Sequence, residues 1–293
     1  MRRMFGNKSL SIQASFFLCS SLLLAGCQWL DQIGPEPSFL NDRISGYKLH
    51  QDLVFGPDKS LTLDLYQPLS IDKNPAEVVI LLHGGAWISG DKTFLYPTVE
   101  LLLNKNKNLA IVNMNYQVTP KDSSTLLARQ LNDIDTAIKF LISHADTFNL
   151  RKNNYRLAGL SAGGHLALTY AYSTKETSLH TVIGFSAPTE LSINSLMDRS
   201  LWINVEKLLG KKYGDSTDVF KNASPFHLAS FRSPRTMLVY GLRDNLVSPR
   251  QGEMLEKKLR LLNVPRRFDV FAQETHETTP QTAANQIMVS FEE

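Results

Sequence analysis

A run of five apolar residues, Val78–Leu82, is the sequence feature that most constrains the fold of this chain. An uninterrupted run of this length is typical of a strand buried on both faces, whereas a strand with one face in water alternates apolar and polar residues. Two strands of the alternating kind are expected before it, at 47–55 and 61–66. Further strands are expected at 109–113, 156–158, 181–185, 236–240 and 267–271. Helices are expected at 122–145, at 251–262 and at 280–290, and one more is expected to begin directly after residue 161. This alternation predicts an α/β fold with a mostly parallel central sheet and helices on both faces.

Two stretches refine this outline. The helix at 122–145 is predicted because its apolar residues recur at steps of three and four, and the polar residues 122–124 offer N-terminal caps. Residues 189–230, by contrast, break the alternation of strands and helices. Because the stretch is longer than an ordinary connection, we interpret it as a small insertion in the domain.

The N-terminus has the composition of a targeting segment. Residues 1–26 contain three basic residues, no acidic residue and an apolar stretch between 16 and 24, which ends in Leu24-Ala25-Gly26-Cys27. This ending resembles the bacterial lipobox, in which a signal peptidase cuts before the cysteine and the cysteine is lipidated. It predicts a signal peptide at 1–26, a lipid on Cys27, a polar tether at 27–45 and a folded domain at 46–293. An uncleaved N-terminal anchor with an incidental cysteine is the alternative.

The resemblance also implies a location, the bacterial cell envelope, with the lipid on Cys27 as the contact to the membrane. Gln28, in place of an aspartate after the lipidated position, favours the outer membrane. Cys19 and Cys27 are the two cysteines of the chain, so the mature domain is expected to contain no disulfide and no CxxC metal site. Removing residues 1–26 takes three of the 31 basic residues and none of the 28 acidic ones, which leaves no basic excess for a nucleic-acid partner.

Gly159-Leu160-Ser161-Ala162-Gly163 matches the pattern G-x-S-x-G between a predicted strand and a predicted helix. The chain must turn sharply from strand to helix there, and side chains two residues on either side of the serine would collide. The serine hydroxyl then stands at the carboxyl edge of the sheet, where the following helix directs its N–H groups at negative charge. The context therefore predicts Ser161 as a nucleophile.

His83-Gly84-Gly85-Ala86-Trp87 directly follows the buried strand at 78–82. Acyl transfer develops an oxyanion that backbone N–H groups can stabilise, and glycines let a backbone approach a carbonyl group closely. We therefore predict an oxyanion hole formed by the N–H groups of Gly85 and Ala86 from this loop and of Ala162 from the turn.

A serine nucleophile needs a base and an acid that orients the base. Asp244 follows the strand at 236–240, and His276 follows the strand at 267–271, so both are expected at the edge that carries Ser161. The order Ser161, Asp244, His276 is the order of the α/β-hydrolases. These three residues are the predicted catalytic triad.

With these motifs the chain resembles an α/β-hydrolase of the esterase group that carries His-Gly-Gly-x-Trp, close to bacterial carboxylesterases of the BD-FAE type and to arylformamidases. The matching segments span nearly all of the mature chain: His83–Trp87, Ser89–Lys92, Asn115–Tyr116, Gly159–His165, Asp244 and His276. The resemblance implies a Ser-Asp-His esterase without a metal or an organic cofactor. Ala86 departs from the third glycine of HGGG lipases, which leaves the pair of oxyanion donors in the loop open.

Other polar and aromatic residues receive structural interpretations. His83 is expected to brace the loop, Trp87 to pack beneath it, and His165 to pack or to form a hydrogen bond. Glu274 and Glu277 compete with Asp244 only as neighbours of His276. Four further histidines are expected on the surface or as hydrogen-bonded core residues: His50, His144, His180 and His227. Asp215 and Asp218 of the insertion are expected to be solvated. Four apolar residues of the insertion are expected either to line an acyl pocket or to bury the insertion itself: Leu201, Trp202, Ile203 and Phe226.

The sequence thus predicts a serine carboxylic-ester hydrolase that cleaves short-chain or acetyl esters through an acyl-enzyme. Its expected partner is a small ester substrate. Two alternatives stay open at this point, an arylformamidase-type amide hydrolase and a hydrolase-fold envelope lipoprotein that only binds a partner. The natural ester and the oligomeric state are not predicted.

Overall fold

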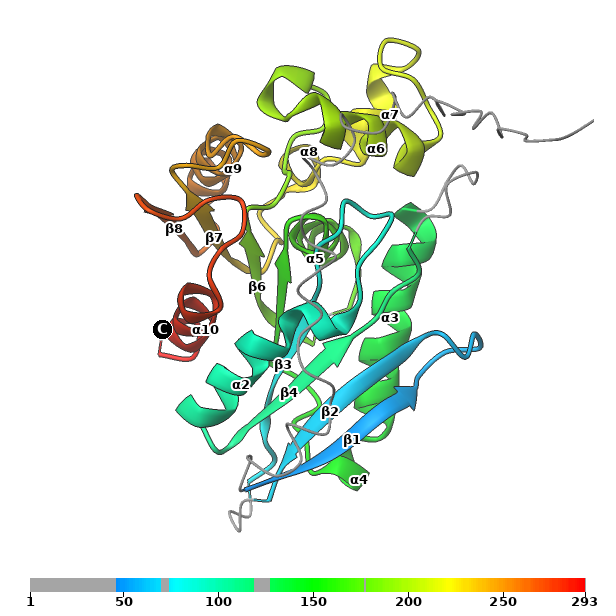
Figure 1. The fold of residues 1–293 in the computed structure, drawn as a ribbon, viewed down its shortest axis with the longest axis vertical. Coiled ribbons are helices and arrows are strands. Elements are labelled where there is room, and N and C mark those ends of the chain that lie inside the picture. The colour runs from blue at the N-terminus through cyan, green and yellow to red at the C-terminus, as the bar shows by residue number, and fades with distance from the viewer. Residues whose placement is uncertain (1–45, 70–73, 119–126, 177, 293) are drawn as a thin grey trace, which may run out of the picture. The chain divides into compact units, whose positions relative to one another are not determined.

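The computed structural model describes residues 46–69, 74–118, 127–176 and 178–292 (Figure 1). The predicted signal peptide, Cys27 and the tether lie outside the described residues, so all three stay predictions. Within the described ranges, no helix combines the length and the apolar character needed to cross a bilayer.

One eight-stranded sheet organises the described residues, in the order β1-β2-β4-β3-β5-β6-β7-β8 (Figure 1). The pairs β1–β2 and β2–β4 are antiparallel, and every other neighbouring pair is parallel. The strands are β1 (Tyr47–Val54), β2 (Thr62–Pro68), β3 (Glu77–Leu82), β4 (Leu109–Met114), β5 (Tyr155–Leu160), β6 (Leu179–Phe185), β7 (Arg235–Gly241) and β8 (Arg266–Phe271). The prediction of a mostly parallel α/β sheet is therefore confirmed, and each expected strand is present.

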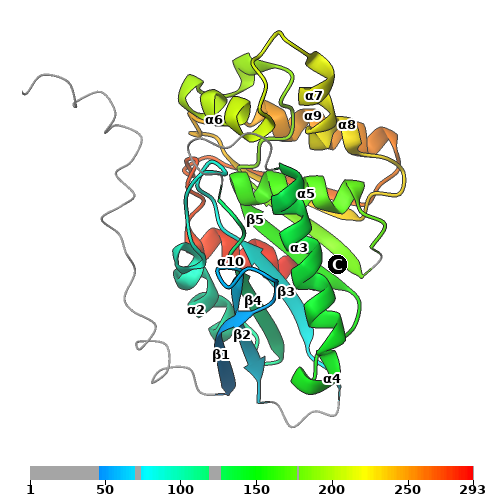
Figure 2. The same ribbon diagram turned by 90° about the vertical axis from the view of Figure 1, so that its right-hand side faces the viewer.

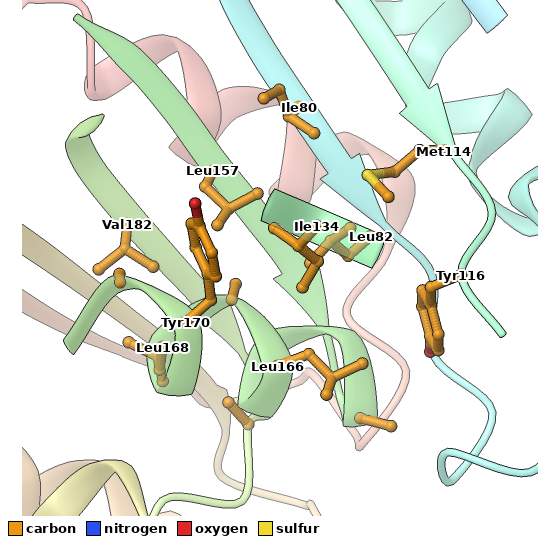
Figure 3. Close-up of a cluster of buried hydrophobic side chains, with 14 of the residues drawn as sticks. Ile80, Leu82, Met114, Tyr116, Ile134, Leu157, Leu166, Leu168, Tyr170 and Val182 are labelled. Carbon is orange, nitrogen blue, oxygen red and sulfur yellow. The ribbon is translucent and has the colours of Figure 1, made fainter. Parts of the chain in front are cut away.

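Helices cover both faces of this sheet (Figure 2). The helical segments are η1 (Lys92–Leu95), α2 (Tyr96–Lys105), α3 (Leu127–Ser143), α4 (Ala145–Phe148), α5 (Ala162–Ser173), η2 (Asn194–Leu196), α6 (Arg199–Leu209), α7 (Thr217–Asn222), α8 (Pro225–Leu228), α9 (Arg250–Leu261) and α10 (Pro280–Val289). One apolar cluster joins the sheet to α3, α5 and α9, and a second joins it to α2 and α10. Figure 3 shows part of the first cluster, in which Leu166 of α5 and Ile134 of α3 lie near Leu82 of β3.

The helices differ from the expectations in two regions. The helix expected at 122–145 is described from residue 127 and ends at Ser143, and α4 follows as a separate turn, while the predicted caps at 122–124 lie outside the described residues. No helix was expected between 82 and 109, where the structure has η1 and α2. Pro97 lies in the first turn of α2, where its missing N–H group removes no helical hydrogen bond. The expected insertion, 189–230, consists of η2, α6, α7 and α8.

A buried ionic cluster fixes the antiparallel end of the sheet to the segment that follows β3. The Lys92 side chain is 4% exposed, and its ammonium group contacts the carboxylates of Asp64 on β2 and Asp52 on β1. The second oxygen of Asp64 accepts a hydrogen bond from the Tyr96 hydroxyl (3.0 Å). Asn113 of β4 donates to the backbone carbonyl of Lys92 (2.7 Å). Because both charges of the Lys92–Asp64 pair are buried, removing one partner leaves the other without compensation.

We expect Asp64→Asn to lower the free energy of unfolding by about 3 kcal/mol, because it leaves Lys92 with only the solvent-exposed carboxylate of Asp52. Urea unfolding followed by circular dichroism measures the change. The matched control is Glu253→Gln, which removes an exposed ion pair with Lys257 and should leave stability unchanged. Equal losses in the two variants would contradict the role of the buried pair.

Candidate active site

Ser161 sits in the sharp turn between β5 and α5. Its backbone has φ 54° and ψ −116°, a conformation that L-residues rarely adopt. The turn is held because the Ser161 N–H group donates to the Phe185 carbonyl of β6 (2.8 Å) and the Ser161 carbonyl accepts from the His165 N–H group (2.9 Å). A methyl group on Gly159 would lie 2.2 Å from the Gly163 carbonyl oxygen. The glycine in front of the serine is therefore required by the tightness of the turn.

Ser161, His276 and Asp244 form one chain of hydrogen bonds. The Nε2 atom of His276 lies 2.8 Å from the Ser161 hydroxyl oxygen, and its Nδ1 atom lies 2.9 Å from Oδ2 of Asp244. The other oxygen of Asp244 accepts from the N–H groups of Leu246 (2.9 Å) and Val247 (2.8 Å). A carboxylate can only accept, so the Nδ1 atom of His276 carries the proton and Nε2 is free to accept from the serine.

The strand arrangement explains why these three residues meet. Ser161 follows β5, Asp244 follows β7 and His276 follows β8, and these strands run parallel to one another through β6. The carboxyl ends of parallel strands meet at the same edge of a sheet, where the connecting loops can build a site. All three residues are at most 9% exposed. Within the described ranges, no group of three or more His, Cys, Asp or Glu side chains is placed to hold a metal ion.

The carboxylates that compete with Asp244 have other partners or face solvent. Glu274 accepts from the Thr279 N–H group (2.8 Å), the Thr279 hydroxyl (2.7 Å) and the Thr282 hydroxyl, and so stabilises the start of α10. Glu277 is exposed although it is adjacent to His276 in sequence. Asp215 and Asp218 are exposed on the insertion. Asp244 is thus the carboxylate that the structure brings to His276.

The loop 83–87 passes directly beside Ser161, and we refer to these five residues as the oxyanion loop. A methyl group placed on Gly84 would lie 3.5 Å from Cβ of Ser161. The backbone of Ala86 (φ 50°) and of Trp87 (φ 64°) is left-handed. Ala162 is the first residue of α5, so its N–H group has no partner within the helix. The assignment of the Gly85, Ala86 and Ala162 N–H groups as oxyanion donors stays a prediction.

His83 braces this loop from within. Its ring stacks on Tyr116 at 4.2 Å, and its Nδ1 atom lies 2.6 Å from the Gly84 carbonyl oxygen. The Tyr116 hydroxyl in turn donates to the His83 carbonyl (2.8 Å). Burial lowers the pKa of His83 to about 4, so the ring is neutral around pH 7. Its hydrogen-bond partner is the Gly84 carbonyl, whereas the partner of the Ser161 hydroxyl is His276.

Trp87 is fully buried, and its indole N–H group donates to Nδ1 of His165 on α5 (3.1 Å). Its carbonyl accepts from the amide of Gln130 on α3 (3.0 Å). Gln130 was not among the predicted site residues. The available signal was its position three residues after Leu127 and four before Ile134, on the apolar face of the helix, where a buried amide must find partners.

The other histidines lie in separate interactions. His50 pairs with Gln67 across β1 and β2 (2.8 Å), and His227 of α8 pairs with the buried carboxylate of Glu190 (2.8 Å). His144 bonds to the Phe140 carbonyl (2.9 Å), and His180 to the Thr181 hydroxyl (2.8 Å). None of these four rings has a hydrogen bond with Ser161 or Asp244 among the interactions of the described residues.

The apolar residues of the insertion mainly bury the insertion itself. Leu201 and Trp202 belong to the apolar core, and the Trp202 ring stacks on Phe220 at 5.5 Å. Ile203 is 45% exposed. Phe226 is half-buried beneath the ammonium group of Lys258, which lies 5.0 Å from its ring centre. Packing within the insertion therefore accounts for Leu201 and Trp202.

The amino-acid sequence is similar to those of proteins named as esterases. Esterase LipC of Mycobacterium tuberculosis is 24% identical over 232 residues, which cover 74% of this chain and 56% of LipC. Esterase LipQ of the same organism is 24% identical over 224 residues, which cover 71% of this chain and 52% of LipQ. The chain thus spans only about half the length of these two relatives.

Solved structures show the same fold. A truncated carbohydrate esterase from gut microbiota aligns with a TM-score of 0.72 at 19% identity, covering 85% of this chain and 97% of that protein. Esterase B from Lactobacillus rhamnosis aligns with a TM-score of 0.69 at 19% identity, covering 85% of each chain. The sequence profile of the BD-FAE family matches residues 63–259. The chain has the α/β-hydrolase fold and belongs to the BD-FAE family.

Proposed function

We propose that this protein is a serine carboxylic-ester hydrolase that works through an acyl-enzyme on Ser161. The observation that carries the proposal is the hydrogen-bonded chain from Asp244 through His276 to Ser161 at the carboxyl edge of the sheet. This is the arrangement that activates a serine hydroxyl for attack on a carbonyl group. The esterase names of the relatives LipC and LipQ support the same reaction class.

In the first half of the reaction, the Ser161 hydroxyl oxygen attacks the ester carbonyl carbon while Nε2 of His276 accepts the hydroxyl proton. The carboxylate of Asp244 holds the ring in the required tautomer and stabilises the positive charge that forms on it. The carbonyl oxygen becomes an oxyanion, for which the N–H groups of Gly85, Ala86 and Ala162 are the proposed donors.

The intermediate then collapses to the acyl-enzyme. The bond between the carbonyl carbon and the leaving oxygen breaks, and His276 returns its proton to that oxygen, so that an alcohol departs. A water molecule next gives a proton to Nε2 of His276 and attacks the acyl carbon. When the bond to Ser161 breaks, His276 protonates the serine oxygen, which releases a carboxylic acid and restores the site.

Short-chain or acetyl esters are the proposed substrates. Only 7% of Ser161 is exposed, which favours acyl groups that need little room beside the carbonyl carbon. Differences of single methylene groups are expected to change kcat/KM by about 10-fold or more when an acyl group is enclosed by protein.

We expect Ser161→Ala to lower turnover of p-nitrophenyl acetate by a factor on the order of 10⁴–10⁶, because it removes the nucleophile. Asp244→Asn should lower kcat by about 10⁴, since the amide no longer fixes the tautomer of His276. Steady-state rates of the purified variants measure both effects.

The same assay with p-nitrophenyl esters of increasing acyl length should give kcat/KM values that fall as the acyl chain grows.

The matched control is Glu277→Gln, which removes the exposed carboxylate next to His276 and should leave kcat within about twofold of the wild type. A fluorophosphonate probe should label the wild type and Glu277→Gln but not Ser161→Ala. Unchanged hydrolysis by Ser161→Ala would refute the proposed mechanism, and faster cleavage of long acyl chains would refute the proposed substrate class.

We also propose that the enzyme is held at the bacterial cell envelope, in the outer membrane, by a lipid on Cys27. The support is the sequence of residues 1–27, which begins with basic residues, continues with an apolar stretch and ends in four residues that resemble the lipobox. A lipid anchor keeps a water-facing domain at a membrane surface without a spanning helix.

Under this proposal, the full chain made in a bacterial host should incorporate a palmitate analogue and enter the detergent phase of a Triton X-114 extract. Cys27→Ser should abolish both, because the acceptor thiol is gone. Cys19→Ser is the control and should be labelled like the wild type, since this cysteine lies within the predicted signal peptide. Undiminished labelling of Cys27→Ser would exclude the anchor.

A further inference from the structure

We propose that His165 is a positioning residue. Its imidazole ring and backbone fix the relative positions of three segments: the oxyanion loop, the insertion, and the turn at Ser161 between β5 and α5, which we call the nucleophile turn. The inference rests on the proposed function for its consequence in catalysis. It goes beyond that function because it gives the insertion a part in holding the site in its active geometry.

The oxyanion loop needs such a support because its backbone is strained. Ala86 and Trp87 are consecutive residues with positive φ, and neither is a glycine. A left-handed conformation is unfavourable for an L-residue, so two in a row persist only where surrounding contacts enforce them. The contacts of Trp87 therefore determine where the neighbouring N–H groups point.

Trp87 is fixed at two atoms. Its carbonyl accepts from Gln130 on α3 (3.0 Å), and its indole N–H group donates to Nδ1 of His165 on α5 (3.1 Å). The Trp87 side chain is fully buried. An indole N–H group that had no acceptor there would lose the hydrogen bond that it makes to water in the unfolded chain, which is unfavourable. The bond to His165 is thus the side-chain anchor of the strained segment.

The second nitrogen of the His165 ring reaches the insertion. Nε2 lies 2.8 Å from the carbonyl oxygen of Ala223, directly after α7. An indole N–H group can only donate and a carbonyl can only accept, so the ring must carry its proton on Nε2 and none on Nδ1. Burial lowers the pKa of His165 to about 4, which keeps the ring in this neutral form around pH 7.

The Ala223 carbonyl is itself held in place. The next residue, Ser224, accepts from the Leu191 N–H group (2.8 Å) and donates to the Phe220 carbonyl (2.7 Å) through its buried hydroxyl. The backbone N–H group of His165 donates to the Ser161 carbonyl (2.9 Å). One residue thus contacts the nucleophile turn, the oxyanion loop and the insertion.

Breaking this link should weaken transition-state stabilisation more than substrate binding, because an oxyanion exists only after attack. A displacement of about 1 Å in such a site costs about 10²-fold in rate. Trp87→Phe keeps an aromatic ring but removes the indole donor, and His165→Leu removes both ring nitrogens. We expect each variant to lower kcat by about 10–100-fold, with KM within about twofold of the wild type.

The kinetic test uses Trp87→Phe, His165→Leu and their combination on p-nitrophenyl acetate, together with inhibition by a trifluoromethyl ketone that mimics the tetrahedral intermediate. Since both changes remove the same hydrogen bond, kcat of the double variant should fall no further than kcat of the more impaired single variant. In each variant the inhibition constant of the trifluoromethyl ketone should rise by the same factor as kcat/KM falls. Losses confined to KM, unchanged kcat, or additive losses in the double variant would overturn the inference.

Tyr172→Phe is the matched control for disturbed packing. Tyr172 lies on α5 with His165, and the hydrogen-bond partner of its hydroxyl group is the Thr236 hydroxyl (2.9 Å) rather than a group of His165, the oxyanion loop or the insertion. This variant should keep the wild-type kcat. A loss equal to that of His165→Leu would assign the effect to general packing of α5 and overturn the inference.

A measurement independent of activity separates this inference from the proposed function. In ¹⁵N NMR spectra of the intact protein, the His165 ring should show a protonated Nε2 and an unprotonated Nδ1, with no titration between about pH 6 and 8, where ordinary histidines titrate. A ring protonated on Nδ1 overturns the link whatever the activity. A wild type that hydrolyses no ester overturns the proposed function, and the NMR spectra then decide the link alone.

Discussion

The close approach of helix α5 to the end of strand β3 is the constraint on which the site depends. A methyl group on Gly163 would lie 2.3 Å from the His83 carbonyl oxygen and 2.4 Å from the Leu82 carbonyl oxygen, so only a glycine permits this packing. The contact brings the start of α5, with Ser161 directly before it, against the loop that leaves β3. The proposed nucleophile and the proposed oxyanion donors are therefore set by the packing of two elements, rather than by a flexible loop that must close.

Three histidines lie in this small region, and their partners separate their roles. His83 and His165 are buried, with the pKa of each lowered to about 4 by burial, and both face backbone or indole groups. His276 instead has the carboxylate of Asp244 on one nitrogen and the Ser161 hydroxyl on the other. A neutral ring can fix a geometry through one donor and one acceptor, whereas a base must carry positive charge transiently and needs a carboxylate to stabilise it.

Much of this arrangement could be predicted because it follows from local patterns. A residue after a buried strand must emerge at the carboxyl edge of the sheet, so the positions of Asp244 and His276 after β7 and β8 sufficed to bring them together. The Lys92–Asp64 pair could not be predicted, because its members lie on separate elements and their pairing depends on the order β2-β4-β3. For Gln130 the helical pattern could indicate a buried amide, but a single polar residue in an apolar pattern does not say which backbone carbonyl it will meet.

The insertion is joined to the site at a second place besides His165. The Leu246 carbonyl, in the loop that carries Asp244, accepts from the Asp198 N–H group of the insertion (2.8 Å). The Leu246 N–H group meanwhile donates to the Asp244 carboxylate (2.9 Å). The insertion therefore contacts the loop of Asp244 directly and contacts the oxyanion loop through His165. A segment with contacts at both places can fix the position of the Asp244 carboxylate relative to the proposed oxyanion donors. A part of the chain that does not contact Ser161 can therefore affect the geometry of the reacting groups.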